Sequence, residues 1–173
     1  MVKSLLIVNT GDGKGKTTAA LGQVFRALGH GFKVCVLQFL KGTWKYGELE
    51  AAKRFADLLE IHALGRGFTW RSENIEEDIR VAREAWDYAV QVIQSGAFNM
   101  VVLDELTYLI SYGMVPEDEI LECLKNRPSG LHVVVTGRNA SQALIDLADI
   151  VTEMRETKHC FQQGIKGQRG IEF

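Results

Sequence analysis

The feature that most constrains this chain is a glycine-rich segment near its start, residues 10–18, which reads Thr-Gly-Asp-Gly-Lys-Gly-Lys-Thr-Thr. A short apolar run at residues 4–8 precedes it, and an amphipathic stretch at residues 17–28 follows it and ends at Gly29 and Gly31. A buried strand, a glycine-rich loop ending in Gly-Lys-Thr and a helix form the phosphate-binding arrangement known as the P-loop. We therefore expect a nucleotide-binding α/β protein built around this segment.

The phosphate-binding chemistry of this loop follows from its backbone and its two lysines. The full pattern is G-x-x-x-x-G-K-[ST], and the chain departs from it at the first position, where Thr10 replaces glycine. Backbone N–H groups of such a loop, with the start of the following helix, form a nest for phosphate oxygens. Lys16 adds a cation, Lys14 adds a second one, and the Thr17 hydroxyl is the expected ligand of Mg²⁺ (or Mn²⁺).

We predict that MgATP binds to this segment. The residues expected to contact the nucleotide are Asn9, Thr10, Gly11, Asp12, Gly13, Lys14, Gly15, Lys16, Thr17 and Thr18. The alternative is a glycine-rich turn with two solvated lysines, and the agreement of strand, loop, Lys-Thr pair and helix favours phosphate binding.

Two carboxylates follow another apolar run. Residues 101–105 read Val-Val-Leu-Asp-Glu, so we expect a buried strand that ends on Asp104 and Glu105. In P-loop proteins an acidic residue at this place holds Mg²⁺ directly or through water, and we assign Thr17, Asp104 and Glu105 to the metal. The alternative role for Asp104 is to cap a helix, since aspartate is common at helix starts.

The rest of the chain alternates apolar runs with helical patterns. Strands are predicted at residues 34–39, 60–63, 100–103, 131–136 and 150–154, and helices at residues 48–58, 75–93, 116–126 and 141–148. This order predicts an α/β protein with the three-layer P-loop NTPase (RecA-like) fold, a mostly parallel sheet with helices on both faces, as one domain over residues 1–173. The predicted apolar face of the long helix comprises Ile75, Ile79, Ala82, Trp86, Ala89 and Ile93.

Composition and charge exclude several classes of protein. The 173 residues carry a formal net charge of -2, which argues against a general nucleic-acid or membrane-surface binder. No apolar run approaches the ~18 residues of a membrane span. The three cysteines form no C-x-x-C pair, so we expect no disulfide framework or zinc ribbon, and a reducing, cytoplasmic setting. Cys35 is expected to pack as a small apolar residue and His62 to be structural.

Several further segments are distinctive when they are taken together with the P-loop. In chain order they are residues 29–31 (Gly-His-Gly), 38–44 (Gln-Phe-Leu-Lys-Gly-Thr-Trp), 67–70 (Gly-Phe-Thr-Trp), 101–108 (Val-Val-Leu-Asp-Glu-Leu-Thr-Tyr) and 136–138 (Thr-Gly-Arg). With these motifs the chain closely resembles the P-loop type of cob(I)alamin adenosyltransferase, from Leu6 to Phe173. The P-loop alone is moderately specific, whereas the combination is highly specific.

The resemblance implies a reaction. The reduced Co(I) of a corrinoid (cobalamin or a precursor) attacks the 5′ carbon of ATP, an adenosylated corrinoid forms, and inorganic triphosphate leaves. The nucleophile is the metal, so the protein must position both substrates and stabilise a highly charged leaving group. ATP is expected to lie reversed relative to ordinary P-loop enzymes. A reduced flavoprotein as electron donor and a homodimer are also implied.

The resemblance extends to residues outside the P-loop. Phe68 and Trp70 are expected to line the corrinoid site and exclude ligands from the lower axial position of cobalt, so that they serve catalysis together with Lys16. Arg138 follows a predicted strand end and is placed to reach a phosphate. The full set of further contacts is Arg26, Lys41, Gly42, Trp44, Phe68, Thr69, Trp70 and Arg138. The alternative for these side chains is a core aromatic or a solvated charge.

Two other functions remain compatible with the P-loop. A P-loop ATPase or kinase would use Glu105 to orient water or a hydroxyl, and it would release ADP and phosphate rather than triphosphate. A non-catalytic module that binds or delivers a corrinoid would bind tightly and turn over slowly or not at all. The phosphate product distinguishes the first alternative, and the turnover rate distinguishes the second.

Overall fold

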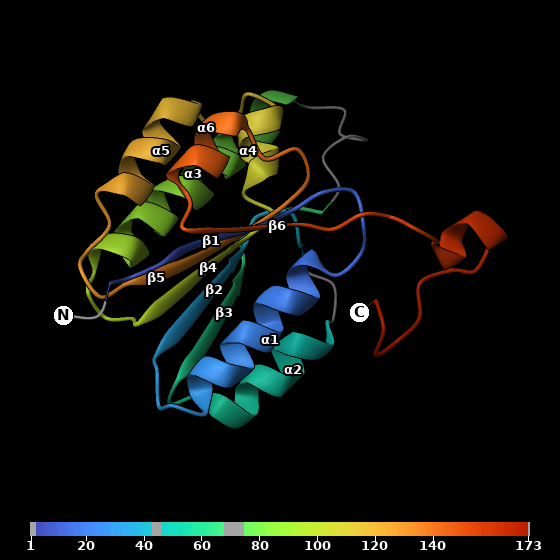
Figure 1. Cartoon of the computed structure of the whole chain (residues 1–173), viewed down its shortest axis with the longest axis horizontal. Helices are drawn as coiled ribbons and strands as arrows, with labels where there is room; N and C mark the ends of the chain where they lie inside the picture. Colours follow the sequence, from blue (N-terminus) through green and yellow to red (C-terminus); the bar gives the residue numbers. More distant parts are fainter. Residues whose placement is uncertain (1–2, 43–45, 68–74, 173) are drawn as a thin grey trace.

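The structure is a computed structural model that describes residues 3–42, 46–67 and 75–172. Within these residues one six-stranded sheet has the spatial order β3-β2-β4-β5-β1-β6 (Figure 1). The strands are β1 (Leu6–Thr10), β2 (Val34–Gln38), β3 (Leu59–Ala63), β4 (Met100–Asp104), β5 (His132–Thr136) and β6 (Ile150–Glu153). The predicted strands are confirmed, with ends that move by one or two residues.

Every pairing between these strands is parallel. The register places Val8 opposite Val135 and Val151, and Leu37 opposite Leu103. Parallel strands gather their carboxyl ends at one edge of the sheet, which is where open α/β sheets bind ligands. The P-loop after β1, the two carboxylates at the end of β4 and the segment after β5 therefore meet at that edge.

Helices cover both faces of the sheet and form three layers (Figure 1). One face packs against α1 (Lys16–Leu28), α2 (Gly47–Ala52) and the short 3₁₀ helix at Lys53–Phe55. The other face carries α3 (Ile75–Gln94), α4 (Thr107–Ser111), α5 (Glu117–Lys125) and α6 (Gln142–Leu147). Because both faces are covered, the central strands are apolar on both sides, as the continuous Val/Leu runs predict.

The long helix α3 differs from its prediction at its start. Ala82, Trp86, Ala89 and Ile93 are buried, whereas Ile75 is 68% exposed and Ile79 is 41% exposed. Our inclusion of these two isoleucines in the core face was therefore wrong. Near the start of α3 the buried face runs through Asp78 instead, so periodicity of apolar residues alone misplaces the buried stripe there.

Two other elements were not predicted in this form. The expected helix at residues 48–58 is shorter, because α2 passes into a 3₁₀ turn before the edge strand β3 begins. Helix α4 follows directly after the carboxylates and is not predicted from the sequence, because a helix of five residues shows too little periodicity.

The tail contains a 3₁₀ helix at Cys160–Gln163 and then returns toward the P-loop (Figure 1). Among the described residues, no helix is both long and apolar enough to cross a lipid bilayer.

Candidate active site

The P-loop is fixed between strand β1 and helix α1 by backbone contacts with the segment after β6. The Gly13 N–H donates to the Met154 carbonyl at 2.7 Å, and the Met154 N–H donates to the Thr10 carbonyl at 2.8 Å. Gly11 has φ +93°, and a Cβ there would lie 2.5 Å from the Met154 oxygen. Only glycine fits this close approach of the loop to the segment after β6.

Thr10, which replaces the first glycine of the usual pattern, has a structural role. Its Oγ1 accepts a hydrogen bond from the Ala140 N–H at 3.1 Å. The neighbouring Asn9 carbonyl accepts from the Gly137 N–H at 3.2 Å. Both Asn9 and Thr10 are largely buried. Their hydrogen bonds join the start of the P-loop to the segment after β5. The hydrogen bond from Ala140 gives Thr10 a structural role, and the contact of Thr10 with nucleotide stays a prediction.

The Lys16 ammonium is enclosed by the loop itself. It donates to the carbonyls of Gly11 at 2.7 Å and Gly13 at 2.8 Å. Burial lowers the pKa of Lys16, and the nearby Glu105 carboxylate opposes that shift. A buried cation held by neutral carbonyls retains much of its attraction for an anion, because its partners carry no full negative charge.

Asp104 is the centre of a buried polar cluster at the end of β4. Its Oδ1 accepts from the Thr17 hydroxyl at 2.8 Å and from the Thr136 hydroxyl at 2.7 Å, and its Oδ2 accepts from Gln38 Nε2 at 3.3 Å. These donors come from α1, β5 and β2, so Asp104 does not cap the helix that follows it. Helix α4 begins after Leu106 and has no side-chain cap. The helix-cap alternative for Asp104 is therefore wrong.

Glu105 lies beside this cluster in a strained backbone conformation. Its φ is +64°, in the left-handed region that glutamate rarely adopts, and its N–H donates to Thr136 Oγ1 at 2.9 Å. Its Oε2 is buried and has no hydrogen-bond partner among the described residues. Burial, followed by the charge of Asp104, raises the pKa of Glu105 to about 7. A carboxyl held in this way is ready to accept a cation or a donor from a ligand.

The raised pKa of Glu105 predicts that the ligand-free protein loses stability as pH rises. In the unfolded chain Glu105 ionises near its usual value of 4.5, while in the folded chain it keeps its proton to about pH 7. Between these values the folded state binds more protons, so each rise in pH favours unfolding, by up to about 3 kcal/mol in total. Glu105→Gln should remove this loss and be the more stable form at pH 8.

Urea unfolding at pH 5, 7 and 8, without nucleotide or divalent cations, measures this effect. Glu76→Gln is a suitable control because Glu76 is exposed in the first turn of α3. If the two glutamine variants show the same pH profile, Glu105 is not the buried group that we describe.

A cleft of about 1090 Å³ opens over the P-loop at the carboxyl edge of the sheet. It brings together many of the predicted site residues, namely Asp12, Gly13, Lys14, Gly15, Lys16, Thr17, Thr18, Lys41, Glu105 and Arg138. The Arg138 side chain is half exposed and lies 4.0 Å from the Asp12 carboxylate. The cations Lys14, Lys16 and Arg138 therefore line the cleft together with the carboxylates of Asp12, Glu105 and Glu172.

The loops after β2 and β3 form another wall of the cleft. Lys41 forms an ion pair with Glu48, and its ammonium lies 4.5 Å from the centre of the Tyr46 ring. A Cβ on Gly42 would lie 2.9 Å from the Arg66 carbonyl carbon, so Gly42 allows these two loops to pack closely. Trp44, Phe68, Thr69 and Trp70 belong to the same two loops but lie outside the described residues.

Arg26 is not brought to this cleft. It is exposed in the last turn of α1, ten residues beyond Lys16, which is about 15 Å along a helix. The fold therefore supports the surface interpretation of Arg26, because the side chain does not line the cleft where the nucleotide is expected.

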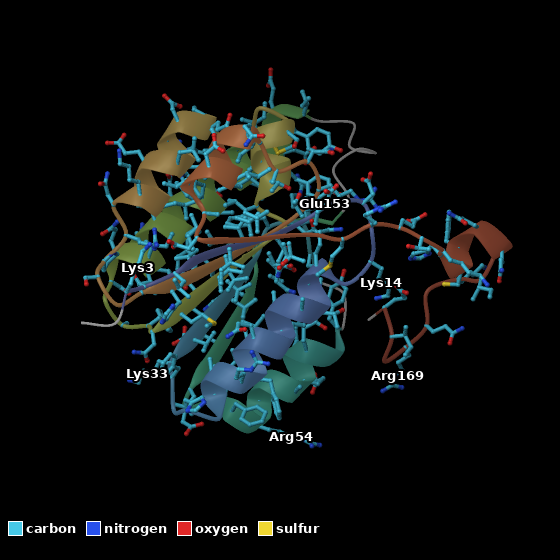
Figure 2. All side chains as sticks on the ribbon, in the orientation of Figure 1. Lys3, Lys14, Lys33, Arg54, Glu153 and Arg169 are labelled. Carbon is cyan, nitrogen blue, oxygen red and sulfur yellow. The ribbon has the colours of Figure 1, made fainter. Side chains whose placement is uncertain are left out.

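Sequence reasoning missed several residues of the site. Gln38 and Thr136 hold Asp104 from neighbouring strands, and their position at strand ends is a signal that could have identified them. The C-terminal tail also reaches the cleft: Lys14 Nζ donates to the Ile171 carbonyl at 3.1 Å and lies 3.6 Å from the Glu172 carboxylate. Figure 2 shows Lys14 beside this returning segment. The tail has no periodic pattern that would have predicted the contact.

The fold and the site together define a P-loop α/β protein with a cleft at the carboxyl edge of its sheet. Its sequence matches the family model described as ATP:corrinoid adenosyltransferase BtuR/CobO/CobP over residues 2–173. The chain belongs to this family, and it is a transferase that acts in adenosyl transfer to a corrinoid. The expected family and fold class are thereby confirmed.

Characterised relatives resemble almost the whole chain. The Corrinoid adenosyltransferase of Escherichia coli K12 is 43% identical over 171 residues, which cover 99% of this chain and 86% of the relative. The Pseudomonas aeruginosa protein of the same name is 44% identical, with 99% and 84% covered. The Corrinoid adenosyltransferase CobA of Salmonella typhimurium is 42% identical, with 99% and 86% covered.

Proposed function

We propose that this chain transfers the 5′-deoxyadenosyl group of ATP to the Co(I) centre of a reduced corrinoid and releases inorganic triphosphate. The observation that carries the proposal is that two groups of residues line one cleft. The first is the P-loop with Lys14, Lys16 and Arg138, and the second comes from the loops at residues 40–41 and 66–67. The first group suits a triphosphate, and the second leaves a place for a bulky second substrate.

The reaction balances without a protein nucleophile. The two electrons of the new cobalt–carbon bond come from Co(I) of the substrate, and the bond between C5′ and its phosphate oxygen breaks toward triphosphate. The chain therefore has to align the two substrates and stabilise the leaving group. In our proposal ATP lies reversed, so that its γ-phosphate end is held by the loop N–H groups and Lys16 while C5′ faces the corrinoid.

A divalent cation fits the oxygen donors next to the loop. The Thr17 hydroxyl and the Asp104 carboxylate are 2.8 Å apart, and Oε2 of the adjacent residue Glu105 is buried with no hydrogen-bond partner in the described part of the chain. Hard oxygen ligands of this kind suit Mg²⁺ or Mn²⁺. When bound, such an ion neutralises charge on the departing polyphosphate. We propose Thr17, Asp104 and Glu105 as the residues that would hold it.

Phe68 and Trp70 are proposed to shape the corrinoid site, with Lys41, Gly42, Trp44 and Thr69 around them. Keeping donors away from the lower axial face of cobalt favours Co(I) over Co(II), because ligands and surroundings set the potential of a metal. Phe68→Ala and Trp70→Ala should each lower the rate from cob(II)alamin with a reductant by at least about tenfold, while the Kd for ATP stays within about twofold. Rates with chemically prereduced cob(I)alamin should fall less.

The control for these variants is Phe25→Ala, because Phe25 is an exposed aromatic residue of α1 and does not line the cleft. Equal losses of ATP affinity and rate in Phe68→Ala and Trp70→Ala would indicate a folding defect and would contradict the proposed role.

The activity itself is tested by an anaerobic assay with cob(I)alamin and MgATP. A light-sensitive alkylcobalamin spectrum with one triphosphate per corrinoid supports the proposal. ADP and phosphate with an unchanged corrinoid spectrum would instead support a P-loop ATPase that uses Glu105 to orient water. Tight corrinoid binding without turnover would support a binding module.

We further propose that the enzyme works in the cytoplasm as a homodimer and receives electrons from a reduced flavoprotein. The exposed apolar side chains of Phe161, Ile150 and Val151 on the tail and the edge strand β6 support self-association. Light scattering after size-exclusion chromatography gives the mass directly. A reconstituted flavoprotein system with cob(II)alamin tests the electron donor.

A further inference from the structure

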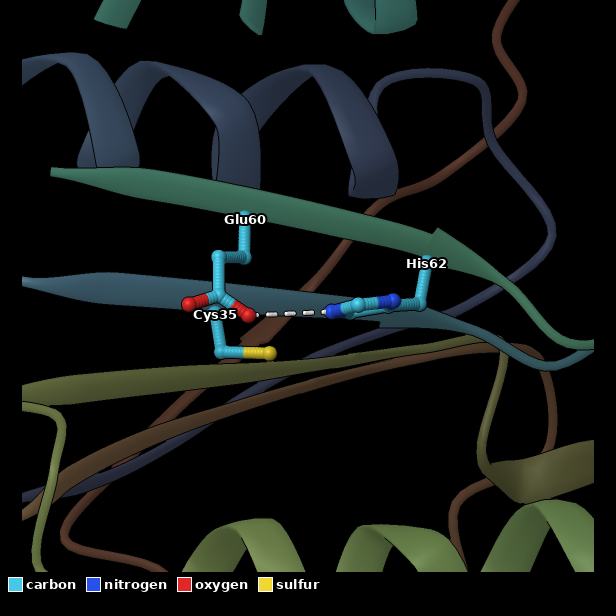
Figure 3. Close-up of side chains that lie close together, drawn as sticks. All are labelled: Cys35, Glu60 and His62. Carbon is cyan, nitrogen blue, oxygen red and sulfur yellow. Dashed lines mark hydrogen bonds and ion pairs between the residues drawn. The ribbon is translucent and has the colours of Figure 1, made fainter. Parts of the chain in front are cut away.

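A cluster of metal-binding side chain types lies outside the cleft. Cys35 on β2, and Glu60 and His62 on β3, each offer one ligand atom, and these three atoms lie within 4.8 Å of one another (Figure 3). None of the three is among the residues that line the cleft. The sequence hides this cluster, because Cys35 is 25 residues from Glu60 and is brought opposite it only by the parallel register of β2 and β3.

The geometry of the cluster is set by rigid elements. Glu60 pairs with Cys35 across the two strands, and His62 is two residues further along β3, so Glu60 and His62 share one face of the sheet. His62 Nε2 is 3.2 Å from Glu60 Oε2. Figure 3 shows the Cys35 sulfur beside both side chains. No flexible loop has to move to bring the three ligand atoms together.

The cluster is both anchored and accessible. Cys35 is fully buried in the core below α3, whereas β3 is the edge strand and the side chains of Glu60 and His62 are 54% and 35% exposed. An ion can therefore enter from the sheet edge and reach the sulfur. Tyr88 of α3 packs edge-on against the His62 ring, and its hydroxyl lies 3.4 Å from His62 Nε2.

We propose that Cys35, Glu60 and His62 form a binding site for a sulfur-seeking divalent transition metal ion of the Zn²⁺ class. Thiolate, imidazole and carboxylate are the ligands that Zn²⁺ takes, with bonds of roughly 2.0–2.3 Å. Ligand atoms around such an ion lie roughly 3–4 Å apart, so the most widely separated pair needs to approach by at most about 1–2 Å. Three protein ligands leave a fourth position for water or for the Tyr88 hydroxyl.

The chemistry of the thiol selects the ion. The proton has to leave to water as the metal–sulfur bond forms, so only an ion with high affinity for sulfur can displace it. Mg²⁺, which prefers oxygen ligands, belongs to the P-loop site instead. The proposed ion would join the edge strand β3 to the centre of the sheet through β2.

The test is a titration of chelator-treated, full-length protein with Co²⁺ as the metal probe. Excess Mg²⁺ is present to occupy the P-loop site, and a thiol-free reductant keeps the cysteines reduced. We expect one Co²⁺ per chain and a sulfur-to-cobalt charge-transfer band in the near ultraviolet, which Zn²⁺ abolishes by competition. Cobalt bound at an oxygen-only site gives no such band. Cys35→Ser should lose the band, and His62→Gln and Glu60→Gln should weaken Co²⁺ binding by at least about tenfold.

Cys160→Ser is the matched control, because Cys160 is exposed and its sulfur lies 4.0 Å from His159 Nδ1, a second place where an ion could meet sulfur and nitrogen. The band should survive in this variant. A band that persists in Cys35→Ser and disappears in Cys160→Ser, or no band at all in the unaltered protein, overturns the proposal. Should Cys35→Ser fail to fold, the half-exposed His62→Gln variant decides, and unchanged binding there overturns the proposal as well.

Discussion

Replacing Lys16 by alanine should reduce the rate of adenosylcobalamin formation by about 10²–10³-fold at saturating MgATP. The Lys16 ammonium is buried inside the P-loop, and among the described residues it donates to the carbonyls of Gly11 and Gly13. A fixed charge of this kind, directed at a leaving group that gains negative charge, is worth about 3–4 kcal/mol to the transition state. Anaerobic single-turnover kinetics with chemically reduced cob(I)alamin and MgATP would measure the loss directly.

Two matched variants make this result interpretable. Arg26→Ala removes an exposed cation from the far end of the same helix, and its rate should stay within about twofold. Lys14→Ala removes the half-exposed second loop cation, which is paired with the tail, and its effect should be intermediate. If Lys16→Ala and Arg26→Ala lose rate equally, triphosphate does not leave from this loop.

The second large effect is expected for Asp104→Asn. The carboxylate accepts hydrogen bonds from Thr17, Thr136 and Gln38, and an asparagine amide cannot accept from all three donors. Unpaired buried donors should lower the free energy of unfolding by about 1–3 kcal/mol. Because the variant also loses a charged ligand of the proposed cation site, we expect the rate at fixed ATP to fall by at least about 100-fold, with much higher Mg²⁺ needed for half-maximal activity.

Asp149→Asn is the control that separates stability from chemistry. Asp149 accepts from the Leu6 N–H at 2.8 Å and from Lys3, at the amino end of β1, far from the P-loop. Its variant should lose stability in urea and keep its Mg²⁺ dependence. An Asp104→Asn variant that behaves in the same way, less stable but with normal Mg²⁺ dependence, would show that Asp104 is structural.

The sequence predicts the parts of this molecule that local chemistry specifies. Runs such as residues 100–104 are apolar on both faces of a covered sheet, so they are recognisable as strands without any knowledge of their partners. In residues 15–17 the glycine allows the turn of the P-loop, the lysine supplies the charge and the threonine supplies the hydroxyl. The apolar face of α3 is predicted correctly from Ala82 onward, and the error at Ile75 and Ile79 arises because periodicity of apolar residues alone misplaces the buried stripe at the start of the helix.

What could not be predicted depends on pairing between distant segments. The partners of Asp104 come from three other elements, and only the strand order brings Gln38 and Thr136 to it. Arg26 is exposed because α1 is long enough to carry it away from the P-loop. The sequence pattern of the helix does not show whether an arginine at that place contacts a ligand. Cys35 and His62 appeared unrelated for the same reason, because their approach depends on the register of two parallel strands.

The return of the tail to the P-loop decides how this protein should be handled at the bench. An affinity tag fused after residue 173 would begin next to Ile171 and Glu172, which line the cleft. The other end of the chain is a safer place for a tag, because Lys3 precedes β1 and the P-loop lies beyond the opposite end of that strand. Affinities for ATP measured on carboxyl-terminal fusions would partly report on the fusion, and those on amino-terminal fusions would report on the enzyme.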